Sequence, residues 1–141
     1  MPYLQIASVK RWAPDLLPHV TVLTYDDETQ KACEAHRGVD CFFDANFVRR
    51  YGKDPNDGKA RNAMSWRKVH AAFELLKAQI PVVILDSDTV FLSDPTEAWS
   101  AALEKYDVVV SSDVGNVYEA QGNMNTKLVI FPATTRSVTL C

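Results

Sequence analysis

The amino-acid sequence predicts a single α/β domain, residues 1–141, built around a largely parallel sheet. Apolar runs of strand length alternate with helical patterns along the chain, which is the order typical of parallel sheets covered by helices. The runs at residues 82–85 (VVIL) and 108–110 (VVV) are continuous, as in strands buried on both faces. A chain of 141 residues is long enough for one core, and no repeat, low-complexity tract or linker divides it.

Composition and charge exclude several kinds of partner. Hydrophobic residues make up 47% of the chain and charged residues 23%, as in globular domains. The formal net charge is -3, which argues against nucleic acid or an anionic membrane surface as the main partner. No apolar run approaches the about 20 residues that span a bilayer, so we expect no membrane segment. The N-terminal stretch MPYLQIASVKRW lacks a signal-peptide core, so a secretory form would need a targeting segment outside this chain.

The first part of the chain predicts two short strands with a helix between them. Residues 19–25 read as a strand that runs into an acidic turn, and the apolar run at residues 39–44 reads as a second strand. Between them, Thr29 is placed to cap a short helix, which Gly38 ends. Residues 51–60 gather glycine, proline, asparagine and aspartate, and they predict a polar surface loop.

Residues 62–79 (NAMSWRKVHAAFELLKAQ) carry the strongest helical pattern in the sequence. Apolar side chains recur at i, i+3, i+4 and i+7, at Val69, Ala72, Phe73 and Leu76. This spacing places them on one face of a helix, and we expect that face to pack against the core.

The remaining chain predicts three more strands and one helix. The strands are expected at residues 80–85, 106–113 and 126–134. The helix is expected at residues 95–106, with Pro95 in its first turn and Asp94 placed to cap it. Pro132 stops the last strand, because proline cannot donate to a ladder of hydrogen bonds.

The three cysteines leave the redox compartment open. Cys33, Cys41 and Cys141 form neither a zinc-binding spacing nor a disulfide-rich framework. In an oxidising environment Cys33 and Cys41 could pair and leave Cys141 over. Three free thiols fit the sequence equally well.

Two aspartates end the most apolar strand, in the stretch IPVVILDSDTVFLSDP at residues 80–95. Ligands of open α/β sheets bind beyond the carboxyl ends of the strands, where Asp86 and Asp88 are expected. Side chains at i and i+2 of a strand point the same way, so the two carboxylates can converge. Two such charges repel unless a proton or a cation lies between them, and carboxylate oxygens suit Mg²⁺ or Mn²⁺. In the alternative interpretation both are solvated turn residues, and Asp88 bonds local backbone groups.

Five segments together resemble a known family, and the resemblance covers most of the chain. They are VTVLTYDDETQKAC, WRKVHAAFELL, VVILDSDTVFLSDP, YDVVVSSD and NMNTKLVIFPATTRS. In these segments the chain is similar to nucleotide-diphospho-sugar transferases of the glycosyltransferase family 77 type. The resemblance implies a GT-A fold, a Rossmann-like α/β/α sandwich, and a UDP-sugar as donor substrate. It also implies the Golgi lumen and a glycan or glycoprotein acceptor.

The resemblance implies roles for five residues. Asp88 would bind the metal, Mn²⁺ or Mg²⁺, that bridges the diphosphate of the donor, and Asp86 would face the ribose or a metal-bound water. Lys68 would approach the phosphates, although a solvated position on the polar face of its helix is a plain alternative. Asp113 and Asn125, the two catalytic candidates, would lie near the donor sugar, although Asp113 could simply terminate a strand. The implied reaction is sugar transfer with retention of anomeric configuration.

The chain departs from the family pattern at several points. Lys127 stands where the family usually has glycine after the Asn-Thr pair, and Gln79 stands where it usually has glycine before the DxD strand. The acceptor-binding half, with its tryptophan and Asp-Gln pair, does not appear before Cys141. The sequence therefore suggests a fold truncated at its C-terminus and leaves two functions open. One is a metal-assisted glycosyltransferase, and the other is a GT-A-like module that binds UDP and metal without transferring sugar.

Overall fold

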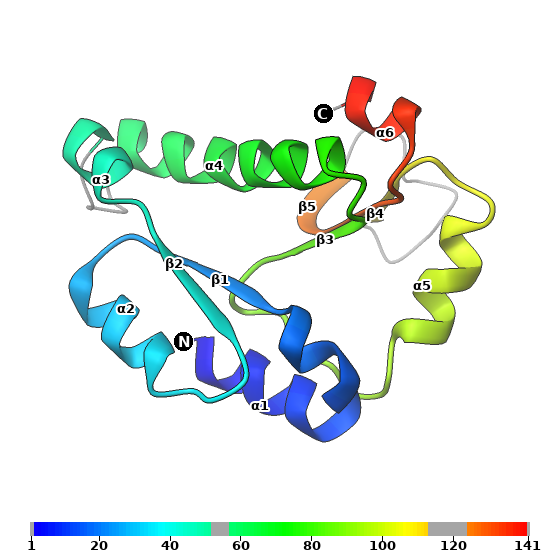
Figure 1. Ribbon diagram of the computed structural model, residues 1–141, viewed down its shortest axis with the longest axis horizontal. Helices are drawn as coiled ribbons and strands as arrows, with labels where there is room; N and C mark the ends of the chain where they lie inside the picture. The colour runs from blue at the N-terminus through cyan, green and yellow to red at the C-terminus, as the bar shows by residue number, and fades with distance from the viewer. Residues whose placement is uncertain (1, 52–56, 113–123, 141) are drawn as a thin grey trace.

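The computed structural model describes residues 2–51, 57–112 and 124–140, and these form a mixed α/β fold (Figure 1). Two strands, β1 (Thr21–Thr24) and β2 (Asp40–Phe43), pair in parallel, with Thr21 opposite Asp40. Three further strands form a second sheet in the order β3-β5-β4. They are β3 (Val82–Leu85), β4 (Val109–Ser112) and β5 (Met124–Phe131).

The predicted largely parallel sheet is wrong for the three-stranded sheet. The strand β5 lies between β3 and β4 and pairs with both in the antiparallel sense. Because β3 and β4 each oppose β5, they run in the same direction as each other, as the strand-helix-strand reading expected. The error lies in β5, because a continuous apolar run records burial and carries no information about strand direction.

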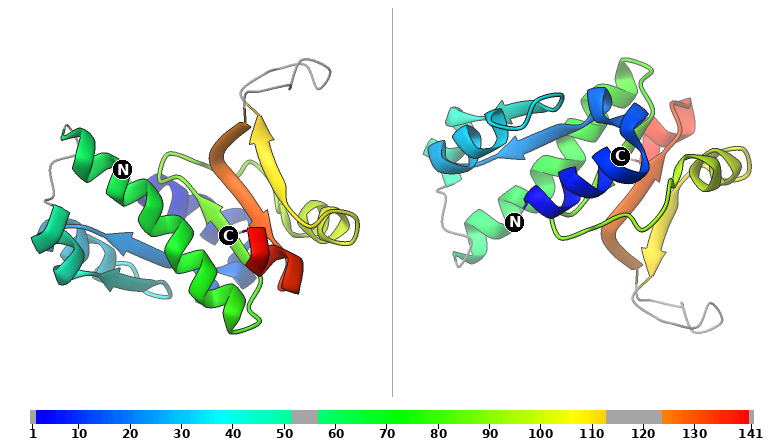
Figure 2. Two further views of the ribbon diagram at one scale, coloured as in Figure 1. Left: turned by 90° about the horizontal axis from the view of Figure 1, so that it is seen from above. Right: turned by 90° about the horizontal axis from the view of Figure 1, so that it is seen from below.

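Helices lie on both sides of the strands. The helix α4 (Gly58–Lys77) runs along one side, and α1 (Pro2–Trp12) and the 3-10 helix η1 (Pro14–His19) lie on the other (Figure 1). Figure 2 shows α4 crossing in front of the strands when the molecule is seen from above, and α1 in front when it is seen from below. The shorter helices are α2 (Asp27–Glu34), α3 (Ala45–Tyr51), α5 (Thr96–Leu103) and α6 (Thr135–Leu140). No helix in the described ranges has both the length and the apolar composition to cross a membrane.

The apolar stripe predicted on the long helix faces the core. Ala72 and Leu76 are buried, and Leu76 forms a cluster with Val129 and Phe131 of β5. Side chains of β3, of α6 and of the residue just before β4 pack around this cluster, namely Val82, Ile84, Val138 and Val108. The helix that carries Lys68 is therefore fixed to the sheet that carries Asp86.

Two predicted helix starts are set by aspartates. Asp26, and not Thr29 as predicted, caps α2, and its carboxylate accepts a hydrogen bond of 2.7 Å from the backbone nitrogen of Thr29. Aspartate is the stronger cap, because its carboxylate reaches the free backbone N–H groups of the first turn. At α5 the N-cap position is Pro95, which was predicted in the first turn, and Asp94 just before it accepts a hydrogen bond of 2.9 Å from the backbone nitrogen of Thr96. The backbone and side-chain hydrogen bonds from Thr96 lower the pKa of the Asp94 carboxyl.

Cys33 and Cys41 form a disulfide that joins α2 to β2, with Cα atoms 6.0 Å apart. The pairing that the sequence left open is therefore present. Cys33 is buried, so the bridge fixes α2 against the parallel pair of strands from the inside.

Loss of this disulfide is expected to lower the free energy of unfolding by about 2.5 kcal/mol, because the cross-link restricts a short loop of the unfolded chain. Guanidinium unfolding with and without dithiothreitol measures the difference. The Cys33→Ala/Cys41→Ala double variant is the control, and its unfolding midpoint should not respond to the reductant. If the unfolding midpoint of the wild type also stayed unchanged in dithiothreitol, the prediction would be wrong.

Candidate functional site

Three predicted segments meet at one edge of the antiparallel sheet. The strands β3 and β4 end at this edge and β5 begins there, because β5 opposes both of them. Leu85 at the end of β3 pairs with Leu128, and Ser112 at the end of β4 pairs with Met124. The edge therefore gathers the carboxyl ends of two strands, which is where α/β sheets place their ligands.

Asp86 and Asp88 lie in a turn directly after β3. The strand ends at Leu85, and the backbone nitrogen of Thr89 donates a 3.0 Å hydrogen bond to the carbonyl oxygen of Asp86. The alternation of a strand, on which the expectation of two converging carboxylates rested, therefore stops before this pair. The turn hydrogen bond uses the main chain of Asp86, so the carboxylate of Asp88 is not needed to close the turn.

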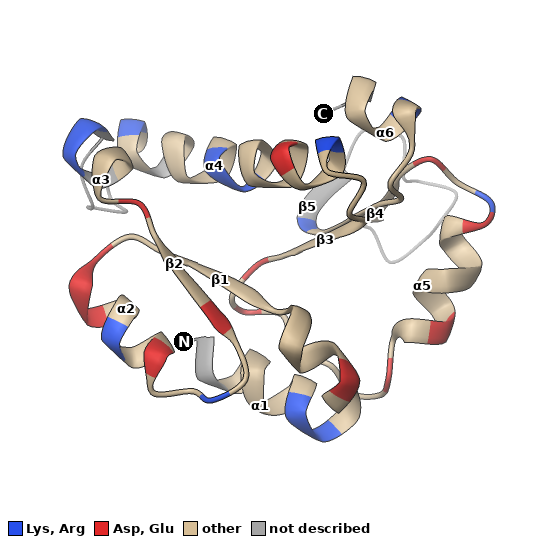
Figure 3. Ribbon diagram, in the orientation of Figure 1, with Lys and Arg blue, Asp and Glu red and all other residues tan. Residues whose placement is uncertain are grey.

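Lys68 and Asp86, both predicted as site residues, form an ion pair in the structure. The ammonium group of Lys68 on α4 contacts Oδ1 of Asp86, and both side chains are half-buried. Figure 3 shows the basic residues along α4 and the acidic turn that follows β3. Lys68 is therefore partly buried and paired with Asp86, and its approach to phosphates stays a prediction from the sequence. The pair compensates the charge of Asp86 and leaves Asp88 as the second carboxylate of the turn.

Asp88 lines a cavity of about 290 Å³ between the turn and α1. The cavity is walled by one side of the turn and by the start of α1, through Leu4, Gln5, Ser87, Asp88, Thr89 and Val90. Asp88 is exposed, and no hydrogen bond or ion pair with another described residue engages its carboxylate. An exposed carboxylate beside two hydroxyl groups offers hard oxygen atoms to a ligand that enters the cavity.

The oxygen atoms of this turn fit a cation that takes only part of its ligands from protein. Within the described ranges, no three histidine, cysteine, aspartate or glutamate side chains are grouped as a complete metal site. Mg²⁺ and Mn²⁺ are commonly held by one or two carboxylates, with water and substrate phosphates as the other ligands. Asp88 can provide such a carboxylate, whereas Asp86 is held by Lys68.

The two catalytic candidates are only partly described. Asp113 lies outside the described residues, which resume at Met124 after Ser112. The backbone of Asn125 pairs with Ser111 of β4, and its side chain lies outside the described part. Lys127, the position at which the chain departs from the family pattern, accepts a 2.9 Å hydrogen bond from the backbone nitrogen of Asp86. The Asn-Thr segment and the acidic turn are therefore neighbours in the sheet.

Sequence reasoning missed the helix that borders the turn. In α1, Gln5 Nε2 donates a 3.2 Å hydrogen bond to the carbonyl oxygen of Asp86. Ser8 Oγ accepts a 3.0 Å hydrogen bond from the backbone nitrogen of Phe91. The available signal was the spacing of Ile6 and Val9 in α1 and of Ala13 just after it, since all three are buried.

A second polar cluster, also missed, lies where β1 and β2 end. Arg67 of α4 forms a 2.9 Å ion pair with Asp44 and lies over the ring of Phe42. The hydroxyl of Tyr25 donates a 3.4 Å hydrogen bond to the carbonyl oxygen of Met64. Burial raises the pKa of Tyr25, the nearby charge of Arg67 opposes that shift, and Asp44 adds to it. The ion pair with Asp44 ties α4 to the parallel strands, while Arg67 Nε is buried without a hydrogen-bond partner among the described residues.

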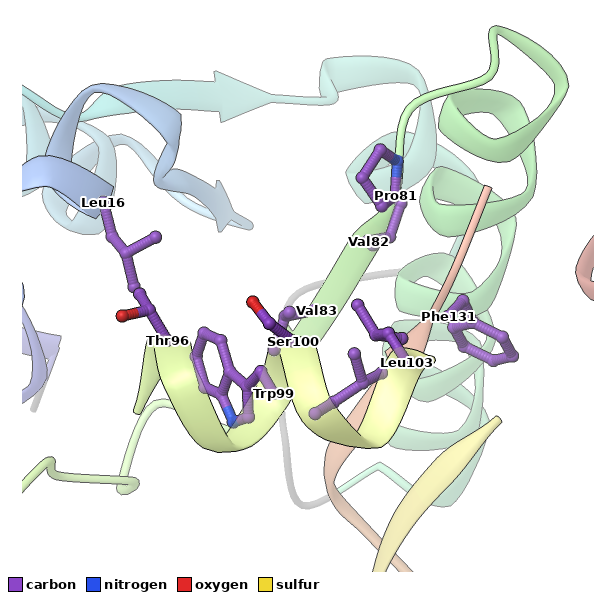
Figure 4. A pocket seen from close by; sticks show the side chains of 10 residues that line it. Leu16, Pro81, Val82, Val83, Thr96, Trp99, Ser100, Leu103 and Phe131 are labelled. Carbon is purple, nitrogen blue, oxygen red and sulfur yellow. The ribbon is translucent and has the colours of Figure 1, made fainter. Parts of the chain in front are cut away.

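A separate cavity of about 190 Å³ lies between α5 and the antiparallel sheet (Figure 4). Trp99 and Leu103 of α5 line it opposite Val83 and Phe131, and none of the described residues in its wall is charged. Without a charged group, this cavity has nothing to hold a phosphate, so it is not the candidate site.

The arrangement is a mixed α/β fold with a carboxylate in a cavity beyond the end of a strand, the place where α/β sheets bind their ligands. Residues 15–141 match the family model for nucleotide-diphospho-sugar transferases. The chain therefore belongs to the nucleotide-diphospho-sugar transferase family, which implies a transferase with a nucleotide-sugar donor and an acceptor. No curated protein and no solved structure matches the chain.

Proposed function

We propose that this chain binds a UDP-sugar through a divalent cation at the turn after β3 and transfers the glycosyl group to a glycan or glycoprotein acceptor. The observation that carries the proposal is the Lys68–Asp86 ion pair beside Asp88, which is exposed in a cavity. The family match over residues 15–141 supports the reaction class. The narrower similarity to glycosyltransferase family 77, and transfer with retention, stay predictions from the sequence.

In the proposed site Asp88 is the protein ligand of the cation, Mn²⁺ or Mg²⁺, and Asp86 is the second acidic group. A cation bound there would stabilise the negative charge that develops on the departing UDP. Lys68 carries three N–H donors, so it can keep its contact with Asp86 and also donate to a phosphate oxygen. The ion pair keeps this ammonium group next to the turn before the donor arrives.

Asp113 and Asn125 are proposed to lie near the donor sugar. Their support is topological, because Ser112 precedes Asp113 and pairs with Met124, the residue before Asn125. The Golgi lumen stays a prediction from the sequence resemblance, while the Cys33–Cys41 disulfide favours an oxidising compartment of any kind.

Calorimetric titration of UDP into the purified protein, with Mn²⁺ and separately with EDTA, tests the proposal. We expect UDP to bind in Mn²⁺ and not in EDTA, because the cation joins the diphosphate to a carboxylate. ADP serves as a control for recognition of the base, since it carries the same diphosphate. Hydrolysis of a UDP-sugar, or transfer from it, would then distinguish a transferase from a module that only binds UDP. A folded protein that binds no UDP in Mn²⁺ would contradict the proposed site.

A further inference from the structure

We infer that α1 positions the acidic turn, with Gln5 and Ser8 as the two positioning residues. The inference rests on the proposed function. It adds that the donor site is positioned by a helix that lies outside residues 15–141, the range of the family match. The turn and its flank, residues 86–91, contact α1 at both ends. Asp88 lies in the middle of this segment, and among the described residues it makes no hydrogen bond or ion pair to α1. The helix therefore acts on Asp88 through the backbone of the turn.

Gln5 holds the beginning of the segment. Its side-chain amide donates to the carbonyl oxygen of Asp86, which also accepts the turn hydrogen bond from Thr89. A carbonyl oxygen has two lone pairs, so both hydrogen bonds can form together. The first residue of the turn is thereby fixed both within the turn and to the neighbouring helix.

Ser8 holds the end of the segment. Its hydroxyl donates a 2.7 Å hydrogen bond to the carbonyl oxygen of Gln5, one turn earlier in the same helix. With its proton used in this way, the oxygen is oriented to accept from the backbone nitrogen of Phe91. Ser8 is buried, so water does not readily replace the hydroxyl if it is removed.

The remaining side chains explain why α1 can serve as a fixed support. Ile6, Val9 and Ala13 are buried and seat the helix in the core. Gln5 and Ser8 are three residues apart, so they lie on one side of the helix, next to this buried stripe. Gln5 also lines the cavity with Asp88, so the helix both supports the turn and forms one wall of the site.

The test compares Ser8→Ala with Ser137→Ala. Ser137 of α6 is a matched control, because it too is a buried serine whose hydroxyl forms hydrogen bonds. Its partners are the carbonyl oxygen of Asp107 and the hydroxyl of Thr134. The first measurement is amide hydrogen exchange at Phe91 without any ligand. The second is the Mn²⁺ concentration that gives half-maximal binding of UDP.

Ser8→Ala should speed exchange at the Phe91 amide and raise the half-saturating Mn²⁺ concentration about threefold to tenfold, the effect of one lost hydrogen bond. Ser8→Thr keeps the hydroxyl and should restore both values towards those of the wild type. Gln5→Met removes the amide group at similar side-chain size, and it too should raise the half-saturating Mn²⁺ concentration. Ser137→Ala should lower the unfolding midpoint and leave the Mn²⁺ dependence unchanged.

Two outcomes would overturn the inference alone. One is wild-type Mn²⁺ dependence in both Ser8→Ala and Gln5→Met. The other is an equal loss in Ser137→Ala, which would mean that general stability and not position governs the site. Absence of UDP binding by the wild type would instead overturn the proposed function, and the positioning role with it.

Discussion

Asp88→Asn is expected to weaken Mn²⁺-dependent binding of UDP at least about a hundredfold, because a hard cation with one or two protein carboxylates loses a charged ligand. Asparagine keeps the size and the carbonyl oxygen of the side chain but removes its negative charge. Asp88 is exposed and lines the cavity, so the substitution breaks no hydrogen bond or ion pair to another described residue. Calorimetric titration of UDP at fixed Mn²⁺ gives the change in affinity directly.

Asp40→Asn is the matched control for this experiment. Asp40 is an exposed aspartate on β2, so its substitution makes the same change of net charge away from the turn. We expect Asp40→Asn to bind UDP as the wild type does and both variants to keep the wild-type unfolding midpoint. If Asp88→Asn bound UDP with undiminished affinity, the cation would have to be held elsewhere, and the proposed role of Asp88 would be wrong.

The parts of this site that the sequence predicted are those encoded by local patterns. A run of apolar residues followed by Asp86 and Asp88 marks the end of a buried strand, whatever the rest of the chain does. The stripe through Ala72 and Leu76 marks a helix face, and it turns Lys68 towards the same region. The structure brings these two patterns together in the Lys68–Asp86 ion pair.

The direction of β5 could not be predicted in this way. Whether a strand runs parallel or antiparallel to its neighbours depends on how the chain returns to the sheet, and side chains record only burial. The segment KLVIF has the same continuous apolar character in either direction. The backbone hydrogen bond between Asp86 and Lys127 belongs to this pairing, and no local sequence pattern predicts it.

The contacts of α1 were missed because they are remote in sequence. Gln5 and Asp86 are 81 residues apart, and Ser8 and Phe91 are 83 residues apart. A single glutamine or serine on a helix has no pattern that separates it from a solvated residue. Only the packing of the helix against the turn gives these two side chains a role.

Leu76→Ala is expected to lower the free energy of unfolding by about 3 kcal/mol, because it removes a fully buried side chain and leaves a cavity in the core. Leu76 has 0% of its surface exposed and contacts Val129 and Phe131 of β5. The neighbouring residue Leu75, 41% exposed, is the matched control for the same chemical change. Leu75→Ala should cost less than about 1 kcal/mol, and urea unfolding measures both variants.

The comparison of Leu76→Ala with Leu75→Ala also tests how the site is assembled. Leu76 lies eight residues after Lys68 on α4 and packs on the sheet whose strand β3 leads to Asp86. This contact therefore sets the separation between the two partners of the ion pair. If both leucine variants lost the same stability, α4 would not be docked through the face that carries Leu76. The orientation that brings Lys68 to Asp86 would then need another source.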